Sequence, residues 1–216
     1  MIIDQLTVGE MAVFCYLVAC PESRDAAAID PAGDTEKILQ ILQEKSLQLK
    51  YIINTHGHAD HTCGNQALAK ITGAKTVMHA LDDDFFTTEE AKGWATELGL
   101  CAASPVDIRV ADGEQLPLGN LTLEFIHTPG HTPGAVCIKV ENNLFTGDTL
   151  FVGAVGRTDL PGGSLERLLK SIEEKILPLP PETVIWPGHD YGEQPRSTIA
   201  HEMKTNPYIT DFILDG

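Results

Sequence analysis

Three histidines and one aspartate occur within six residues of this chain, at His56, His58, Asp60 and His61. They directly follow the apolar run 51–53, so a strand that ends there would present all four side chains in one tight loop. Neutral imidazole and carboxylate groups are common ligands of zinc, iron and manganese. Donors this close together would repel one another or leave hydrogen-bonding capacity unused unless a cation lay among them. Because more donors follow downstream, the spacing favours a pair of metal ions.

Three later segments share one local pattern, an apolar run that ends in a glycine-containing turn with a histidine or an aspartate. The runs 125–126, 144–145 and 184–186 lead to turns that carry His131, Asp148 and His189. Each is typical of a short buried strand that presents a donor where it ends. Loops at strand ends are common places for chemistry on a rigid scaffold. One such turn would be weak evidence, but together with the first cluster they indicate a metal centre.

These motifs resemble the metallo-β-lactamase superfamily along essentially the whole chain, and within it the small glyoxalase II-like (hydroxyacylglutathione hydrolase-like) hydrolases. The matching residues are Ile29-Asp30-Pro31, His56, His58, Asp60, His61, His131, Asp148 and His189. The resemblance implies an α/β fold, a four-layer αββα sandwich in which two mixed β-sheets are flanked by helices. It also implies two metal sites that share one bridging ligand. The first metal would be held by His56, His58 and His131, the second by Asp60, His61 and His189, and Asp148 would bridge them.

By this resemblance the protein is expected to be a metal-dependent hydrolase that cleaves a thioester of the S-2-hydroxyacylglutathione type with a metal-bridging hydroxide. Asp60 and Asp148 are the candidate catalytic acids. A bridging position suits Asp148, because its two oxygens can face different metals, and water held between two cations ionises near neutral pH. Two divalent ions are therefore expected, zinc first, with iron or manganese as alternatives.

Three further residues are candidates for the surroundings of the metals. Asp30 matches the acid that in the superfamily orients the metal loop from behind the ligands, and Thr55 can hydrogen-bond a ligand. Arg157 lies in the glycine-rich loop 155–164, where its guanidinium could grip a substrate carboxylate. Each has a structural alternative: Asp30 and Thr55 as capping groups, and Arg157 as an ion-pair partner of Asp159.

The same loop supports a competing hypothesis. The sequence Gly156-Arg157-Thr158-Asp159, the run 188–191 and the tail around Asn206-Pro207 are similar to persulfide dioxygenases. His56, His131 and Asp148 would then form the two-histidine, one-carboxylate site of a mononuclear Fe(II) oxygenase. The alternative function is therefore sulfur oxidation of glutathione persulfide. A third hypothesis is a binding or scaffold protein with an idle metal site.

The composition fits a compact soluble enzyme. With 216 residues, 43% of them hydrophobic, one domain over residues 1–216 is expected to bury a substantial core. No apolar run approaches a membrane span, and the first residues lack the pattern of a signal peptide. Five cysteines without C-x-x-C spacing suit a reducing cytoplasm, which is the expected location. A monomer or homodimer without a membrane partner is expected.

The net charge of −16, from 15 basic and 31 acidic residues, argues against a nucleic-acid partner, since such binding depends on Lys and Arg. The expected partner is instead a small acidic thioester such as a glutathione conjugate, which would need help from Arg157, Arg196 or Lys204. Full-length glyoxalase II enzymes carry an additional C-terminal helical domain that supplies much of the glutathione site. That domain is expected to be absent here, so the acyl group and its carrier are left open.

The order of apolar segments predicts two similar halves. Strands are expected near 11–19, 26–29, 51–54 and 76–78 in the first half, and near 121–126, 136–140, 143–146 and 184–186 in the second. Helices are expected at 34–46, 63–71, 165–175 and after Pro195. The acidic segment 81–97 is expected to form a helical flap over the site, and 112–119 a turn-rich boundary. Two mixed sheets face to face, with helices outside, is the layered arrangement for this pattern.

Overall fold

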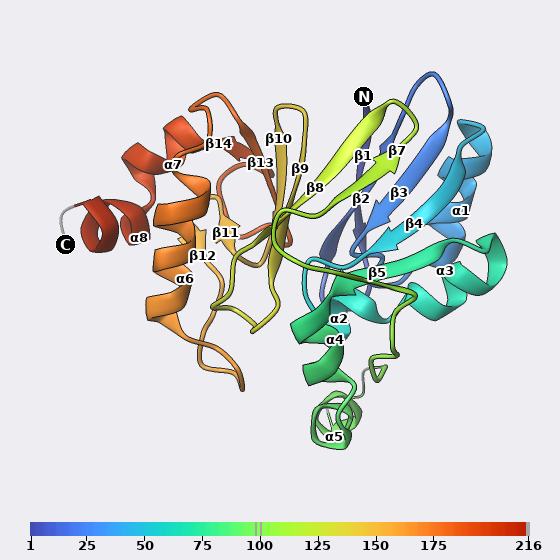
Figure 1. The fold of residues 1–216 in the computed structure, drawn as a ribbon, viewed down its shortest axis with the longest axis horizontal. Coiled ribbons are helices and arrows are strands. Elements are labelled where there is room, and N and C mark those ends of the chain that lie inside the picture. Colours follow the sequence, from blue (N-terminus) through green and yellow to red (C-terminus); the bar gives the residue numbers. More distant parts are fainter. Residues whose placement is uncertain (98, 100, 215–216) are drawn as a thin grey trace.

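The computed structural model describes residues 1–97, 99 and 101–214, and two six-stranded β-sheets form its centre. One sheet has the strand order β1-β2-β3-β4-β5-β6, and the other has the order β14-β13-β10-β9-β8-β7. The sheets face one another, and helices lie on their outer sides (Figure 1).

The first sheet is built from the N-terminal half of the chain. Its strands are β1 (Ile2–Val8), β2 (Val13–Ala19), β3 (Asp25–Ile29), β4 (Gln48–Ile53), β5 (Lys75–His79) and β6 (Ile108–Val110). Helix α1 (Thr35–Glu44) connects β3 to β4, and α2 (Ala59–Thr62) and α3 (Asn65–Thr72) connect β4 to β5. Helices α4 (Ala80–Phe86) and α5 (Glu89–Glu97) precede β6. The pairings from β3 to β6 are parallel and those from β1 to β3 are antiparallel, so the sheet is mixed.

The second sheet is built from the C-terminal half. Its strands are β7 (Gln115–Leu118), β8 (Leu121–His127), β9 (Val136–Val140), β10 (Asn143–Gly147), β13 (Val184–Pro187) and β14 (Ser197–Thr198). A small hairpin, β11 (Leu150–Phe151) and β12 (Ala154–Val155), follows β10. The helical elements are α6 (Leu165–Ser171), its π-helical continuation η1 (Ile172–Ile176), α7 (Ile199–Thr205), α8 (Pro207–Ile209) and the π-helical η2 (Thr210–Leu214). β10 and β13 are parallel, whereas the other pairs are antiparallel.

Strand β2 illustrates why the sheets are covered on both faces. All seven of its residues are buried. Because side chains alternate between the two faces of a strand, Phe14, Tyr16 and Val18 join the cluster between the sheets, while Cys15 and Leu17 join the cluster under α1 and α3. A strand of this composition requires apolar partners on both sides.

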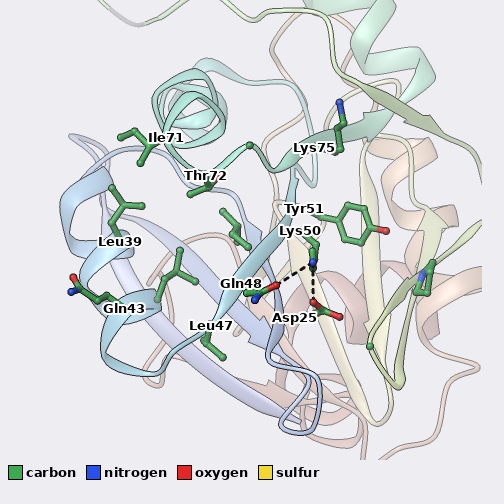
Figure 2. Close-up of a pocket in the computed structure, with 15 residues that line it drawn as sticks. Asp25, Leu39, Gln43, Leu47, Gln48, Lys50, Tyr51, Ile71, Thr72 and Lys75 are labelled. Atoms are coloured by element: carbon green, nitrogen blue, oxygen red, sulfur yellow. Dashed lines mark hydrogen bonds and ion pairs between the residues drawn. The ribbon is translucent and has the colours of Figure 1, made fainter.

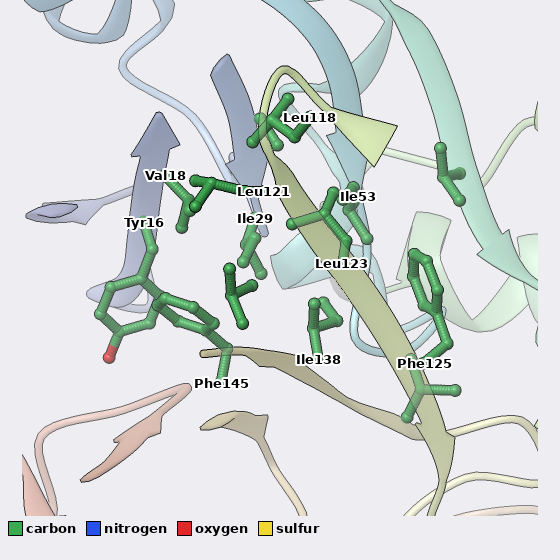
Figure 3. Packing of buried hydrophobic residues seen from close by; sticks show 14 of the residues in the cluster. Tyr16, Val18, Ile29, Ile53, Leu118, Leu121, Leu123, Phe125, Ile138 and Phe145 are labelled. Carbon is green, nitrogen blue, oxygen red and sulfur yellow. The ribbon is translucent and has the colours of Figure 1, made fainter. Parts of the chain in front are cut away.

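Apolar clusters fill all three interfaces between the layers. Between the sheets, Tyr16, Ile29 and Ile53 from the first meet Leu123 and Phe145 from the second, as Figure 3 shows. A third cluster lies between the second sheet and the helices α6, η1 and α7. The predicted four-layer αββα sandwich is therefore confirmed. No helix in the described ranges is long and apolar enough to cross a membrane.

Some elements differ from the sequence-based expectation. The segment 112–119 contains strand β7, because Leu118 pairs with Leu121 across a tight turn at Gly119 and Asn120. Strand β1 was not anticipated, since most of its residues are only partly buried, yet it pairs with β2 along its whole length. The segment 81–97 forms two helices, the first of which is anchored by buried acids.

The layered core predicts a large difference between two leucine-to-alanine substitutions. Leu123 is 0% exposed between the sheets, whereas Leu165 on α6 is 41% exposed. Leu123→Ala should lower the free energy of unfolding by about 2–5 kcal/mol, because it leaves a cavity in a packed interface. Leu165→Ala should change it by about 0.5 kcal/mol or less. Urea denaturation followed by circular dichroism measures both, and equal losses would contradict this account of the core.

Candidate metal centre

The seven predicted metal ligands all come from segments that follow strands, and the structure brings them together. They lie after β4 or on α2 (His56, His58, Asp60, His61), between β8 and β9 (His131), after β10 (Asp148) and after β13 (His189). The ends of β10 and β13 meet at one edge because these strands are parallel neighbours. Each sheet therefore delivers its share of the donors to the same end of the molecule.

One group of donors consists of three histidines. His58 Nδ1 lies 2.9 Å from His131 Nε2, and His131 Nε2 lies 3.3 Å from His56 Nε2. One ligand atom from each residue falls within 4.8 Å of the other two. This spacing is compatible with three nitrogen ligands around one cation.

A second group combines one carboxylate with two histidines. His61 Nε2 lies 3.3 Å from His189 Nε2 and 3.6 Å from Asp60 Oδ2. The distance from His189 Nε2 to Asp60 Oδ2 is 3.7 Å. These atoms also lie within 4.8 Å of one another, so they form another set that could surround a cation.

Asp148 lies between the two groups. Its Oδ1 is 3.5 Å from His61 Nε2, and its Oδ2 is 3.7 Å from His131 Nε2 and 3.6 Å from His189 Nε2. Within the described chain, Oδ1 is buried and has no hydrogen-bond partner. A buried carboxylate oxygen without a partner is costly, and a cation would satisfy it. The donor set and this unpaired oxygen fit a bound metal cation.

The protonation of the donors is set mainly by burial. Burial lowers the pKa of His58 to about 3 and those of His131 and His189 to about 4, so these imidazoles are neutral near pH 7 and keep a free lone pair. Burial raises the pKa of Asp148 to about 7. Burial also acts to lower the pKa of His61, but Asp148, Asp30 and Asp60 together raise it to about 10. Excess negative charge around His61 is what a bound cation would neutralise.

Asp30 and Thr55 contact the Nδ1 atoms of two candidate ligands, His61 and His56. Asp30 Oδ2 lies 3.0 Å from His61 Nδ1 and accepts a hydrogen bond from Thr55 Oγ1 at 2.7 Å. Thr55 Oγ1 is in turn 3.1 Å from His56 Nδ1. Such contacts fix the ring orientation and leave the opposite nitrogen free for a metal. Asp30 has a φ of 50°, a left-handed conformation that aspartate tolerates better than most residues.

Asp82 is a buried acid that sequence reasoning missed. It lies in the first turn of α4, is 0% exposed, and accepts hydrogen bonds from Gly57 N, Thr132 Oγ1 and Gly134 N at 2.8, 2.7 and 2.5 Å. One carboxylate therefore ties the loop that carries His56 and His58 to the loop that carries His131. The three consecutive aspartates 82–84 suggest an exposed acidic run, and only the tertiary structure shows that Asp82 and Asp83 are buried while Asp84 is exposed.

Arg157 contacts the site through its main chain. Its carbonyl oxygen lies 2.7 Å from His131 Nδ1. Its guanidinium forms two hydrogen bonds of 2.8 Å to Asp159, and the side chain is 62% exposed. The ion pair with Asp159, which is the structural alternative to substrate binding, is therefore formed. The side chain is exposed, and its role in substrate binding stays a prediction.

Aromatic side chains lie beside the ligands on two sides. The Phe86 ring is 5.1 Å from the His58 ring, and the Tyr191 ring stacks on His189 with centroids 5.2 Å apart. The main chain also passes very close to the donors at Gly188, where a Cβ atom would lie 2.3 Å from Asp148 Oδ1. The glycine of the Pro-Gly-His motif is therefore required by this close approach.

A separate cavity of about 980 Å³ is lined by none of these ligands, and Figure 2 shows the residues around it. It is lined by aliphatic residues such as Leu39, Leu47 and Ile71, together with the ion pair between Lys50 and Asp25 at 3.3 Å. It opens where β4 and β5 begin, at Gln48 and Lys75, whereas the metal ligands follow the ends of strands. It is therefore not part of the candidate metal centre.

A buried cluster of histidines and aspartates at the rim of two facing mixed sheets, with helices outside, defines a class of αββα protein built around a metal site. The sequence matches the Metallo-beta-lactamase superfamily over residues 8–189. The chain belongs to this superfamily.

Two proteins whose sequences are similar to this chain are named for different activities. Hydroxyacylglutathione hydrolase GloC from Haemophilus influenzae is 37% identical over 196 residues, covering 87% of this chain and 89% of the relative. Persulfide dioxygenase ETHE1 from Homo sapiens is 34% identical over 201 residues, covering 91% of this chain and 71% of the relative. Among solved structures, TTHA1623 in a di-iron-bound form superposes with a TM-score of 0.81 at 33% identity, over 95% of this chain and 99% of that one. These identities do not separate a hydrolase from a dioxygenase.

The position of Asp82 predicts a specific loss of stability. Asp82→Asn should lower the free energy of unfolding by about 2–3 kcal/mol, because the amide places a donor against buried donors of two loops. Asp84→Asn on the same helix is a matched control, since its side chain is 67% exposed and pairs with Arg109 at the surface. It should cost about 1 kcal/mol or less. Thermal and urea unfolding of the two variants test this prediction. An unchanged stability of Asp82→Asn would show that the hydrogen bonds of Asp82 do not hold the two loops together.

Proposed function

We propose that this protein is a metal-dependent thioester hydrolase with two divalent ions. The observation that carries the proposal is the position of Asp148. Its two oxygens face histidines of both donor groups, at 3.5 Å from His61 and 3.7 Å from His131. A carboxylate placed in this way suits a pair of cations, and a pair of cations suits hydrolysis.

In this proposal each candidate ligand, and each residue that contacts a ligand, has a specific role. His56, His58 and His131 would hold one ion, Asp60, His61 and His189 the other, and Asp148 would contact both. Bound ions of this kind supply a hydroxide near neutral pH and polarise a carbonyl oxygen. Asp60 and Asp148, the proposed catalytic acids, would supply negative charge that balances the charge of the ions. Asp30 and Thr55 would keep the histidine rings in place. We propose zinc as the first choice of metal, with iron or manganese as alternatives.

The proposed substrate is a small acidic thioester, with a glutathione conjugate as the first candidate. The similarity to GloC supports this class. Because the chain has a net charge of −16, an anionic substrate needs a local cation in addition to the metals. The exposed guanidinium of Arg157, on the loop whose main chain contacts His131, is suited to provide it by exchanging Asp159 for a substrate carboxylate. We propose that the protein acts in the cytoplasm, without membrane or nucleic-acid partners.

A second candidate function is oxidation of a persulfide at a single Fe(II). His131 Nε2 lies 3.3 Å from His56 Nε2 and 3.7 Å from Asp148 Oδ2, so His131 is next to both other members of a two-histidine, one-carboxylate set. The similarity to ETHE1 supports this alternative. Both functions use the same side chains, so they differ in metal occupancy and in the reaction catalysed.

Metal-quantified protein assayed without oxygen should hydrolyse S-D-lactoylglutathione. Asp148→Ala should lower kcat/KM by at least about 100-fold, because the groups that hold the ions lose their shared ligand. The same preparations are then given glutathione persulfide and oxygen, with oxygen uptake as the readout. Thioester turnover retained in Asp148→Ala would rule out the two-ion mechanism. Oxygen uptake without thioester turnover would establish the dioxygenase instead.

Substrate binding by Arg157 predicts a change in KM rather than in kcat. Arg157→Ala should raise the KM for an anionic thioester roughly 5-fold or more, with a smaller effect on kcat, because the lost contact is made equally in the ground and transition states. Arg167→Ala, an exposed arginine on α6, is the control and should leave KM unchanged. An unchanged KM for Arg157→Ala would assign this residue to the structure of its loop.

A further inference from the structure

Two cysteines from distant parts of the sequence are neighbours beside the metal centre. Cys63 directly follows α2 as its C-cap residue, and Cys101 lies in the segment between α5 and β6. The amide nitrogen of Cys101 donates a hydrogen bond to Cys63 Sγ at 3.0 Å, across a sequence separation of 38. Neither thiol has a part in the proposed hydrolysis.

These two thiols differ from the other three in accessibility. Cys15, Cys20 and Cys137 are each 0% exposed. Cys101 is exposed and Cys63 is partly exposed. Both also line a pocket of about 450 Å³ that includes Met11 and Asp60. A small molecule in solution can therefore reach this pair, whereas the other thiols are enclosed in the core.

The geometry of the pair is compatible with a disulfide. The Cα atom of Cys101 is bonded to its nitrogen at about 1.5 Å, so it lies within about 4.5 Å of Cys63 Sγ. Disulfide-bonded residues have Cα atoms about 4.4–6.8 Å apart, with each sulfur close to the partner's Cβ. The Cys63 sulfur therefore already lies next to the backbone of Cys101, at a distance that the exposed Cys101 side chain can span.

The segment around Cys101 has no regular secondary structure that would oppose this rotation. Residues 101–106 contain neither helix nor strand. Side-chain bonds hold the segment further along, between Gln66 and Ser104 and between Asp83 Oδ1 and Val106 N, the latter at 3.1 Å. The backbone of Cys101 is thus already held against Cys63, and its side chain is exposed.

We propose that Cys63 and Cys101 are a modification site, a pair of thiols that is reversibly oxidised to a disulfide by a low-molecular-weight disulfide. The exposed Cys101 thiolate attacks one sulfur of the oxidant, and the first small thiolate leaves. Cys63 then attacks the Cys101 sulfur, and the second small thiolate leaves. Two protein thiols are oxidised, the small disulfide is reduced to two thiols, and two protons pass from the protein to the released thiolates.

The cross-link would act on the element that carries two of the candidate ligands. Asp60 and His61 lie on α2, and Cys63 is the C-cap residue that follows this helix. A Cys63–Cys101 bond would join α2 covalently to the chain between α5 and β6. Because it also closes a long loop in the unfolded chain, it should raise the melting temperature of the oxidised protein.

Incubation of the metal-loaded full chain with oxidised glutathione tests the proposal. The count of free thiols after denaturation should fall from five to three, since two thiols are consumed. Peptide mapping without reductant should find the Cys63 and Cys101 peptides joined, and dithiothreitol should restore five thiols. The melting temperature should rise by roughly 5 °C or more on oxidation.

Single variants separate the proposal from general thiol reactivity. Cys63→Ser should stop at a stable glutathione adduct on Cys101, and Cys101→Ser should react much more slowly at Cys63. Neither should gain thermal stability on oxidation. If the unmodified sequence keeps five thiols, or yields only glutathione adducts without a joined peptide, the proposal is overturned.

Discussion

The candidate metal centre depends on the apolar packing between the two sheets. Every group of donors identified in the described residues combines both halves of the chain: His56 and His58 with His131, His56 and His61 with Asp148, and Asp60 and His61 with His189. The distances within each group therefore persist only while the cluster around Tyr16, Ile53 and Phe145 keeps the sheets together. Interiors of this kind are close-packed and deform little, so they hold ligands accurately.

The second requirement is electrostatic. Burial disfavours the charged forms of the ligands, which explains why most of these histidines are neutral and why the pKa of Asp148 rises to about 7. For His61 the neighbouring acids Asp148, Asp30 and Asp60 act against burial and raise its pKa to about 10. Asp82 secures the two loops that carry His56, His58 and His131 by accepting hydrogen bonds from backbone and hydroxyl donors. A site of this kind is built to receive positive charge.

The sequence predicted the fold class and the positions of the donors because both depend on local patterns. Apolar runs that end in Gly-Asp or Pro-Gly-His turns mark strands β10 and β13, and the dense cluster after β4 marks the metal loop. What the sequence did not show depends on distant partners. Strand β1 is recognised by its pairing with β2, and Asp82 by hydrogen bonds to Gly57 and Thr132 from other segments. The proximity of Cys63 and Cys101 has the same origin, since they are 38 residues apart.

The order of strands in the first sheet has a consequence during synthesis. From β1 to β6, neighbours in space are neighbours in sequence, so this sheet can pair through connections within the first 110 residues. A nascent chain that has emerged only this far already displays His56, His58, Asp60 and His61. Each donor group identified in the described residues still lacks one member, which is His131, Asp148 or His189. Completion of the coordination sphere therefore marks the moment when the second half has docked.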